Sequence, residues 1–179
     1  MFDALPEIGG QFNIAKQIPG KEEFHETLRY YRTMLDLHGV DLRLNTRVTT
    51  DDLLAFDETI LATGIAPRLP AIDGIDHPKV LSYLDVLRDK APVGAKVAII
   101  GCGGIGFDTP MFLSQSGAAT SQDIGEFCRE WGIDTSLQTA GGLSAEGPQL
   151  SKSPRQIVML QRKASKPGEG LGKTPGWIH

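Results

Sequence analysis

The chain contains 179 residues with a formal net charge of −4 at pH 7, and 40% of its residues are apolar. The acidic balance argues against a general nucleic-acid-binding surface. No apolar run approaches the roughly 18 residues that a membrane-spanning helix needs, and the start of the sequence lacks a basic, apolar leader. Two cysteines, Cys102 and Cys128, form neither a disulfide framework nor a four-thiolate cluster. We therefore expect a reduced, cytoplasmic protein with a globular core.

The first part of the chain shows both helical and strand patterns. Phe2 and Asp3 look like the end of a strand, and a turn follows at residues 7–11. Apolar residues then recur at helical spacing from about residue 20, and Gly39 stands where a glycine usually follows a helix. The pattern predicts a helix there, built on Phe24, Leu28, Tyr31 and Leu35.

Two further strands are expected before a linker. Residues 40–48 alternate between apolar and polar side chains, residues 51–56 read as a short helical turn, and residues 58–62 read as a buried strand. Residues 66–78 hold three prolines and Gly74, a composition typical of a linker. We place a domain boundary in this segment.

A short helix is predicted directly after the linker. Ser82 stands before the apolar pair of residues 86–87, with Asp85 three positions further on. This spacing indicates a capping box, in which the two side chains bond each other's backbone amides. The helix should extend to Arg88.

The rest of the second part is organised around residues 96–106, KVAIIGCGGIG. An unbroken apolar run at residues 97–100 suits a strand buried on both faces of a parallel sheet. Gly101, Gly103 and Gly106 follow at G-x-G-x-x-G spacing. The first allows a tight turn, the second allows close approach of a pyrophosphate, and the third allows close packing of helix on strand. The motif predicts a dinucleotide site, against the alternative of a glycine-rich turn in a cofactor-free α/β domain.

The helix after these glycines should run to about Gln115, with a kink or a disturbed start at Pro110. An insert at about residues 116–154 follows, with one short helix built on Ile124, Phe127, Cys128 and Trp131. The strand pattern resumes at residues 156–160. The fold class we expect is α/β, with two incomplete Rossmann-like (doubly wound, three-layer) dinucleotide-binding units and residues 96–100 central in the sheet.

Two cations, Arg162 and Lys163, follow the strand at residues 156–160. An NAD site carries an acid at this point for the ribose 2′-hydroxyl, whereas a 2′-phosphate favours cations. The pair therefore favours NADP over NAD, with a solvated charge run as the alternative. His25, His38, His77 and His179 show no metal-ligand spacing, and we expect no metal site.

The sequence resembles the bacterial multidomain 2,4-dienoyl-CoA reductase (NADPH) family, which combines FMN, FAD and an iron–sulfur cluster. The resemblance covers essentially the whole chain, and its most specific motif is the last. The matching segments are Phe2-Asp3 with EIGGQF, PGKEEF, LATG at 61–64, GIDHPKVLSYLDVL at 74–87, IIGCGGIGFDT at 100–109, and QIVMLQRKASKPGEGLGKTPGWIH at 156–179. The earlier motifs are shared with relatives similar to trimethylamine dehydrogenase.

The resemblance implies that NADPH passes a hydride to FAD, and that electrons reach FMN through a [4Fe–4S] cluster to reduce a dienoyl-CoA in fatty-acid β-oxidation. It implies a partial FAD-binding domain at residues 1–68 and a partial NADPH-binding domain at residues 69–179. The FMN, the cluster and the acyl-CoA partner are expected only in a full-length family member, because the barrel and the cluster cysteines have no counterpart in this sequence. No nucleic-acid or membrane partner is expected.

The resemblance also assigns FAD contacts in the first part. Asp3 would bind the ribose hydroxyls, and Ala62-Thr63-Gly64 would form a turn that closes over the flavin. The remaining implied contacts are Gly10, Gln11, Lys21 and Val48. These positions also have readings that involve no FAD. Asp3 would be a solvated acid at a strand end, Gly10 a turn glycine and Lys21 a lysine at a helix start. Val48 would be a core valine, and residues 62–64 an exit from a strand into a loop. Two alternatives stay open for the chain, a nucleotide-binding module without turnover and a part of a trimethylamine dehydrogenase-like flavoenzyme.

We predict that the purified chain retains little or no FAD and does not reduce a dienoyl-CoA. A flavin pyrophosphate needs a glycine-rich turn and a helix N-terminus, and no second G-x-G-x-x-G precedes Asp3. A flavin absorbance spectrum of the purified chain measures this directly. Near-stoichiometric bound FAD would contradict the prediction.

Overall fold

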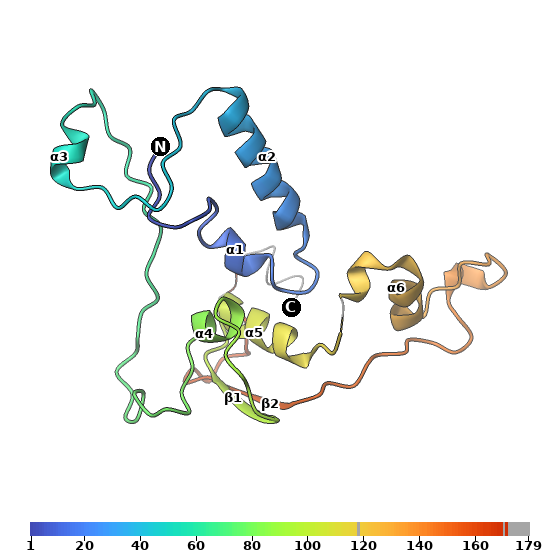
Figure 1. Cartoon of the computed structure of the whole chain (residues 1–179). Coiled ribbons are helices and arrows are strands. Elements are labelled where there is room, and N and C mark those ends of the chain that lie inside the picture. The colour runs from blue at the N-terminus through green and yellow to red at the C-terminus, as the bar shows by residue number, and fades with distance from the viewer. Residues whose placement is uncertain (118, 170, 172–179) are drawn as a thin grey trace. The chain divides into compact units, whose positions relative to one another are not determined.

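The computed structural model describes residues 1–117, 119–169 and 171 of the chain. The chain divides into two compact units. The first comprises Met1–Gln17 and Lys21–Leu81, and the second comprises Ile18–Gly20 and Ser82–His179. Figure 1 shows three helices in the first unit, and a pair of strands with further helices in the second. The assignment of residues 1–68 to FAD and 69–179 to NADPH stays a prediction, because it concerns cofactors.

The regular elements of the first unit are helices. They are α1 (Phe12–Ala15), α2 (Glu23–Leu37) and α3 (Thr50–Leu53). Helix α1 packs on α2, where the rings of Phe12 and Phe24 lie 4.8 Å apart between centroids. Helix α2 ends as predicted: Gly39 has φ +62°, and its amide donates to the carbonyl of Asp36 at 3.0 Å.

The strands expected in the first unit do not form in the described residues. Segment 40–48 forms backbone hydrogen bonds with residues 1–5 and an isolated parallel bridge between Phe2 and Arg43, but it forms no regular strand. Segment 58–62 is irregular, and Ile60 and Leu61 are 92% and 79% exposed. A strand is stable only against neighbouring strands or a covering helix, and segment 58–62 has no strand neighbour among the described residues. The prediction of a buried strand at this position is therefore wrong.

The second unit contains a parallel pair of strands, β1 (Lys96–Ile100) and β2 (Gln156–Leu160). The register pairs Lys96 with Gln156 and Ile100 with Leu160. Helix α5 (Gly104–Ser114) contacts both strands, and α4 (Tyr83–Leu87) contacts α5. The predicted capping box at α4 is present: Ser82 Oγ accepts from the Asp85 amide at 3.2 Å.

Few side chains of the described residues are buried. Those of the second unit are Ile18, Val86, Leu87 and Leu113, with Thr109 as the buried polar side chain. Leu87 of α4 and Leu113 of α5 are 2% and 3% exposed. The core of this unit therefore lies where α4 meets α5.

Helix α5 continues through Pro110. Proline removes the amide that would bond the carbonyl four residues earlier, yet the helix begins at Gly104 and runs unbroken to Ser114. The hydroxyl of Thr109 donates to the carbonyl of Ile105 at 2.8 Å, one turn back. The disturbed start expected at Pro110 is therefore not seen in the secondary structure, and the kink stays a prediction.

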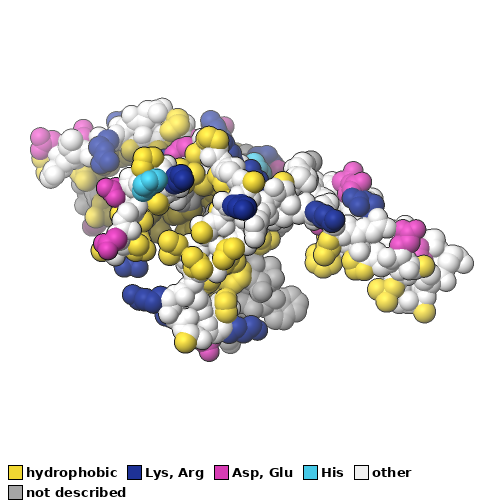
Figure 2. All heavy atoms as spheres, turned by 90° about the horizontal axis from the view of Figure 1, so that it is seen from below, with side chains coloured by type: hydrophobic (Ala, Val, Ile, Leu, Met, Phe, Trp, Pro, Cys, Tyr) yellow, Lys and Arg dark blue, Asp and Glu magenta, His cyan; other side chains and the backbone are white. Residues whose placement is uncertain are grey.

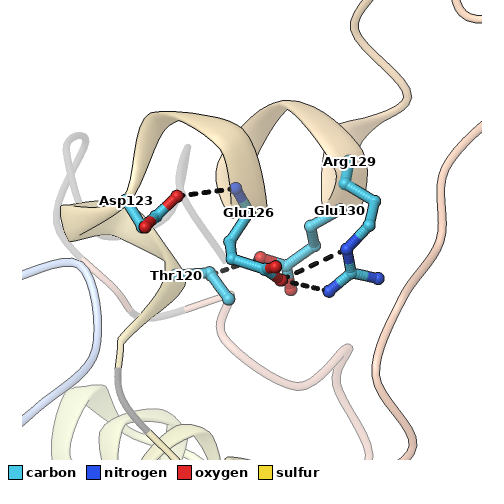
Figure 3. A network of polar contacts seen from close by, with 5 residues as sticks. All are labelled: Thr120, Asp123, Glu126, Arg129 and Glu130. Carbon is cyan, nitrogen blue, oxygen red and sulfur yellow. Dashed lines mark hydrogen bonds and ion pairs between the residues drawn. The ribbon is translucent and has the colours of Figure 1, made fainter.

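The insert at residues 116–154 contains the predicted helix, α6 (Ile124–Trp131), and two short 3-10 turns, η1 (Thr120–Gln122) and η2 (Ala140–Gly142). Asp123 accepts from the amide of Glu126 at 2.9 Å and so caps α6. Figure 3 shows this cap together with the Glu126–Arg129 ion pair and the bond from Thr120 to Glu130. These local contacts order the insert around its helix.

Helix α6 ends at a glycine in the left-handed conformation, and a hydrogen-bonded loop follows it. Gly132 has φ +66°, and a Cβ at this position would lie 2.6 Å from the carbonyl carbon of Gly147. The loop that follows is held by Asp134, whose carboxylate accepts hydrogen bonds from Ser136 and Thr139. These bonds, those from Ser136 first, hold the pKa of Asp134 well below its usual range.

The observed fold is a mixed α/β arrangement with a small parallel sheet, and two Rossmann units are not evident in it. The parallel pairing of segment 96–100 is confirmed, but its expected central position and burial on both faces are not. Both strands alternate between exposed and half-buried residues, and Ile100 is 67% exposed. With two strands in the described sheet, each strand has an open edge, and the apolar run is only partly covered.

Apolar side chains reach the surface in many places. Figure 2 shows hydrophobic groups distributed over the visible face, and Ile124 and Leu137 of the insert are 82% and 86% exposed. Among the described residues no helix is long and apolar enough to cross a membrane. The same residues contain no group of three or more metal-ligating side chains that could hold a metal ion.

We predict that Leu87→Ala destabilises the second unit by about 2–5 kcal/mol, because it removes a fully buried side chain between α4 and α5. Leu150→Ala is the matched control, since Leu150 is 69% exposed, and should change stability by less than about 0.5 kcal/mol. Urea unfolding followed by circular dichroism measures both. Equal effects would contradict the proposed core.

Candidate functional site

The most highly constrained segment of the second unit joins β1 to α5. Gly101 follows β1 with φ +119°, a conformation that residues with a side chain rarely adopt. Its amide donates to the carbonyl of Leu160 at 2.8 Å. This bond fixes the start of the turn to the end of β2, so that the turn leaves the sheet at the carboxyl ends of both strands.

Gly106 lies in the first turns of α5, directly against Gly101. A Cβ at Gly106 would lie 2.2 Å from the carbonyl oxygen of Gly101 and 2.8 Å from its carbonyl carbon. No side chain fits in this space without moving the backbone. Gly106 is predicted to allow close packing of helix on strand, and the close contact in the structure is with the backbone of Gly101, the residue directly after β1.

Gly103 is the N-cap residue of α5, and the space around it is open. It has φ −93°, and a Cβ built there meets no atom within 4 Å. The first turn of α5 carries no acidic side chain. The amides at this helix start bear partial positive charge and suit an anion. A ligand phosphate could approach the backbone at this point.

Arg162 and Lys163 lie just beyond β2, at the carboxyl ends of the strands. The glycine turn, residues 101–106, leaves the sheet at the same end. The parallel register brings Ile100 beside Leu160, and both strands end there. Both side chains are exposed, and among the described residues no hydrogen bond or ion pair engages either of them. The structure therefore brings the three motif glycines and the two cations to one edge of one sheet.

The segment after Lys163 also returns to α5. A Cβ at Gly168, which has φ +82°, would lie 3.3 Å from the ring of Phe107. Phe107 directly follows Gly106, and its amide donates to the Gly103 carbonyl at 3.0 Å. The segment that follows β2 thus comes near α5 at Gly168. The final part of the most specific sequence motif, residues 170 and 172–179, lies outside the described residues.

The residues expected to contact FAD lie on separate segments of the first unit. The carboxylate of Asp3 accepts the amide of Leu5 at 2.9 Å, and the Asp3 amide donates to the Arg43 carbonyl at 3.0 Å. Gly10 has φ +46°, and Gln11 precedes α1 and is exposed. Asp3 therefore closes a local turn, and its FAD role stays a prediction.

The other expected FAD contacts lie in three further places. Lys21 is half-buried before α2, and Val48 is half-buried before the cap of α3. Residues 62–64 are exposed and irregular, and Gly64 has φ +73°. No regular sheet of described residues joins these segments into one surface, so a shared flavin role also stays a prediction.

Gly9 is a constrained position that the sequence analysis did not single out. It has φ +119°, and a Cβ there would lie 2.5 Å from a methyl carbon of Leu28 on α2. The glycine pair after a strand-like start was the signal that could have identified it. Its role in the structure is to let the turn before α1 pack on α2.

We predict that Gly106→Ala destabilises the second unit by about 1–3 kcal/mol, because the added methyl overlaps the Gly101 carbonyl. Gly104→Ala lies two residues earlier in the same helix with open space around it, and should be neutral or slightly stabilising. Thermal unfolding compares the two variants. If both melt at the same temperature, the close contact is not a constraint.

No family model matches the chain. Cinnamate reductase of Clostridium sporogenes is 38% identical over 99 residues, covering 54% of this chain and 15% of the relative. Bilirubin reductase of Mediterraneibacter gnavus is 35% identical over 124 residues, covering 68% and 19%. NADH oxidase of Thermoanaerobacter brockii is 30% identical over 124 residues, covering 66% and 19%. The chain therefore spans about a fifth or less of the length of these relatives.

Among solved structures, a 2-naphthoyl-CoA reductase complex matches with a TM-score of 0.60 and 24% identity. The match covers 89% of this chain and 28% of that one. At this identity the likeness concerns the fold, whereas the sequence matches establish common descent with larger enzymes that transfer electrons. The chain is homologous to a segment of bacterial multidomain flavin reductases.

Proposed function

We propose that the second unit binds NADPH, and that the chain is the FAD- and NADPH-binding part of a flavoprotein oxidoreductase. One observation carries the proposal: the glycine turn at residues 101–106 and the cations Arg162 and Lys163 meet at the carboxyl edge of the β1–β2 pair. In open α/β sheets, ligands bind outside the carboxyl ends of the strands. The NADH oxidase among the homologues uses a nicotinamide coenzyme, which supports this class of ligand.

The residues present fit a dinucleotide pyrophosphate. The backbone at Gly103 is open to a ligand, whereas Gly106 is closed by the Gly101 carbonyl. An anion at the start of α5 would meet unpaired amides and the positive end of the helix dipole. The absence of an acidic side chain in the first turn avoids repulsion.

The preference for NADPH rests on charge. A 2′-hydroxyl is bound by a carboxylate that accepts a hydrogen bond from it, and a 2′-phosphate is bound by cations. Beyond β2 the chain supplies Arg162 and Lys163, both exposed and available to an anion. Arginine can bind a phosphate through two parallel hydrogen bonds, and lysine adds a point charge.

For the first unit we propose an FAD contact surface on the segments that hold Asp3, residues 10–11, Lys21, Val48 and residues 62–64. Asp3 would accept from a ribose hydroxyl, since Leu5 engages only its Oδ1. Lys21 would contribute charge, and the glycine turns would allow backbone approach. When bound, FAD would supply the hydride acceptor for NADPH, while the residues of this chain bind and orient the two nucleotides.

For the larger protein we propose reduction of a conjugated acyl compound, with 2,4-dienoyl-CoA as the substrate that the sequence resemblance implies. Two of the matched enzymes are named for cinnamate and 2-naphthoyl-CoA, which are also conjugated acyl compounds. The chain matches 15% of cinnamate reductase and 28% of the 2-naphthoyl-CoA reductase chain, and we propose that the acyl group binds in the remainder of the larger protein. The chain's own contribution is the supply of electrons from NADPH.

The test of the NADPH site replaces its two cations. In the double variant Arg162→Ala/Lys163→Ala, NADPH affinity should fall by at least about tenfold, because a hydrogen bond to a charged group contributes about 1.5–3 kcal/mol. NADH affinity should change by less than about twofold, since NADH lacks the 2′-phosphate. Calorimetric titration of the chain with each coenzyme measures both values.

The control for this test is Lys96→Ala. Lys96 is an exposed cation at the amino end of β1, at the opposite edge of the same sheet. Its removal tests whether net charge alone sets the affinity, and it should leave the ratio of the two affinities unchanged. Equal losses for NADPH and NADH in the double variant would show that these cations do not bind the 2′-phosphate.

A further inference from the structure

Gln161 lies between the end of β2 and the two cations, Arg162 and Lys163. It is the first residue after β2, and its side chain is half-buried. Its neighbour Leu160 accepts the Gly101 amide. Gln161 therefore stands between the strand end that holds the glycine turn and the cations at positions 162 and 163.

The side-chain amide of Gln161 bonds the backbone on the far side of the cations. Its Nε2 donates to the carbonyl of Lys163 at 2.9 Å and also to the carbonyl of Ser165. Carbonyl oxygens only accept hydrogen bonds, so the NH₂ group, with two donor hydrogens, must face them. One side chain thus closes the backbone of residues 161–165 into a turn.

This turn sets the backbone positions from which the side chains of Arg162 and Lys163 extend. Arg162 and Lys163 lie within the closed segment, and their side chains take no part in closing it. Further along the chain Gly168 lies near Phe107 of α5, since a Cβ built there would lie 3.3 Å from the Phe107 ring. A turn that is closed by hydrogen bonds before a ligand arrives loses less conformational freedom when the ligand binds.

We infer that Gln161 is a positioning residue for 2′-phosphate recognition: its amide holds the turn from which Arg162 and Lys163 reach the coenzyme. The inference rests on the proposed NADPH site. Gln161 itself is not required to touch the nucleotide, and it acts through the two cations. Its removal should therefore affect the coenzyme that carries the 2′-phosphate and spare the one that does not.

The test is Gln161→Met, which keeps the length of the side chain and removes both hydrogen bonds. NADPH affinity of the full chain should fall by roughly threefold to thirtyfold, which lies within the range of coupling between neighbouring residues, while NADH affinity should change by less than about twofold. Gln156→Met is the matched control, an exposed glutamine at the start of the same strand. It should leave both affinities unchanged.

A double-variant cycle separates positioning from general loss of structure. In the Arg162→Ala/Lys163→Ala background, Gln161→Met should cause no further loss of NADPH affinity, because nothing remains to be positioned. An equal loss for both coenzymes, or a full additional loss in that background, would overturn the inference. If Gln161→Met does not fold, Gln161→Asn, one methylene too short to reach both carbonyls, replaces it in the same comparison.

The two proposals fail in different ways. If Arg162→Ala/Lys163→Ala leaves the preference for NADPH intact, the assignment of the 2′-phosphate to this pair is wrong, and the inference about Gln161 falls with it. If the pair variant abolishes the preference but Gln161→Met does not reduce it, only the role of Gln161 is wrong.

Discussion

The contact of Gly106 with the carbonyl of Gly101 is the constraint on which the second unit depends. The 2.2 Å that would separate a Cβ from the carbonyl oxygen leaves no room for any side chain. This contact brings α5 close to the end of β1, and the Gly101 amide binds the end of β2. Helix start, glycine turn and both strand ends therefore converge at one edge, which is the geometry that an anionic nucleotide requires.

Charge and geometry reinforce each other at this edge. Arg162 and Lys163 are separated from the glycines by more than fifty residues of sequence, including the whole insert, and parallel pairing returns them to the same end of the sheet. The insert neither interrupts the register of β1 with β2 nor enters it. Its order comes from its own contacts around α6, with the cap by Asp123 and the bonds to Asp134. An insertion that satisfies its own backbone can interrupt a strand crossover at little thermodynamic cost.

The first unit has a different character. Its helices are ordered by local contacts, such as Phe12 on Phe24 and the closure of α2 at Gly39. Among the described residues, segment 58–62 has no strand neighbour, and Ile60 and Leu61 are exposed. Local propensity is sufficient for a capped helix, whereas a strand needs neighbours that lie elsewhere in the chain or in a partner. The 124 residues that match bilirubin reductase make up 19% of that enzyme, so most of it lies outside the match.

The sequence by itself determined the elements that depend on neighbouring residues: the helix closed by Gly39, the capping box of Ser82 and Asp85, the strand–glycine–helix motif and the helix at residues 124–131. These rest on local hydrogen bonds and side-chain spacing. Only the tertiary structure decided the rest. An apolar run indicates a strand but not how many strands will cover it, and so Ile100 is exposed. Spacing along the chain also could not show that the amide of Gln161 closes the turn that carries Arg162 and Lys163, because that bond depends on the path of the backbone after β2.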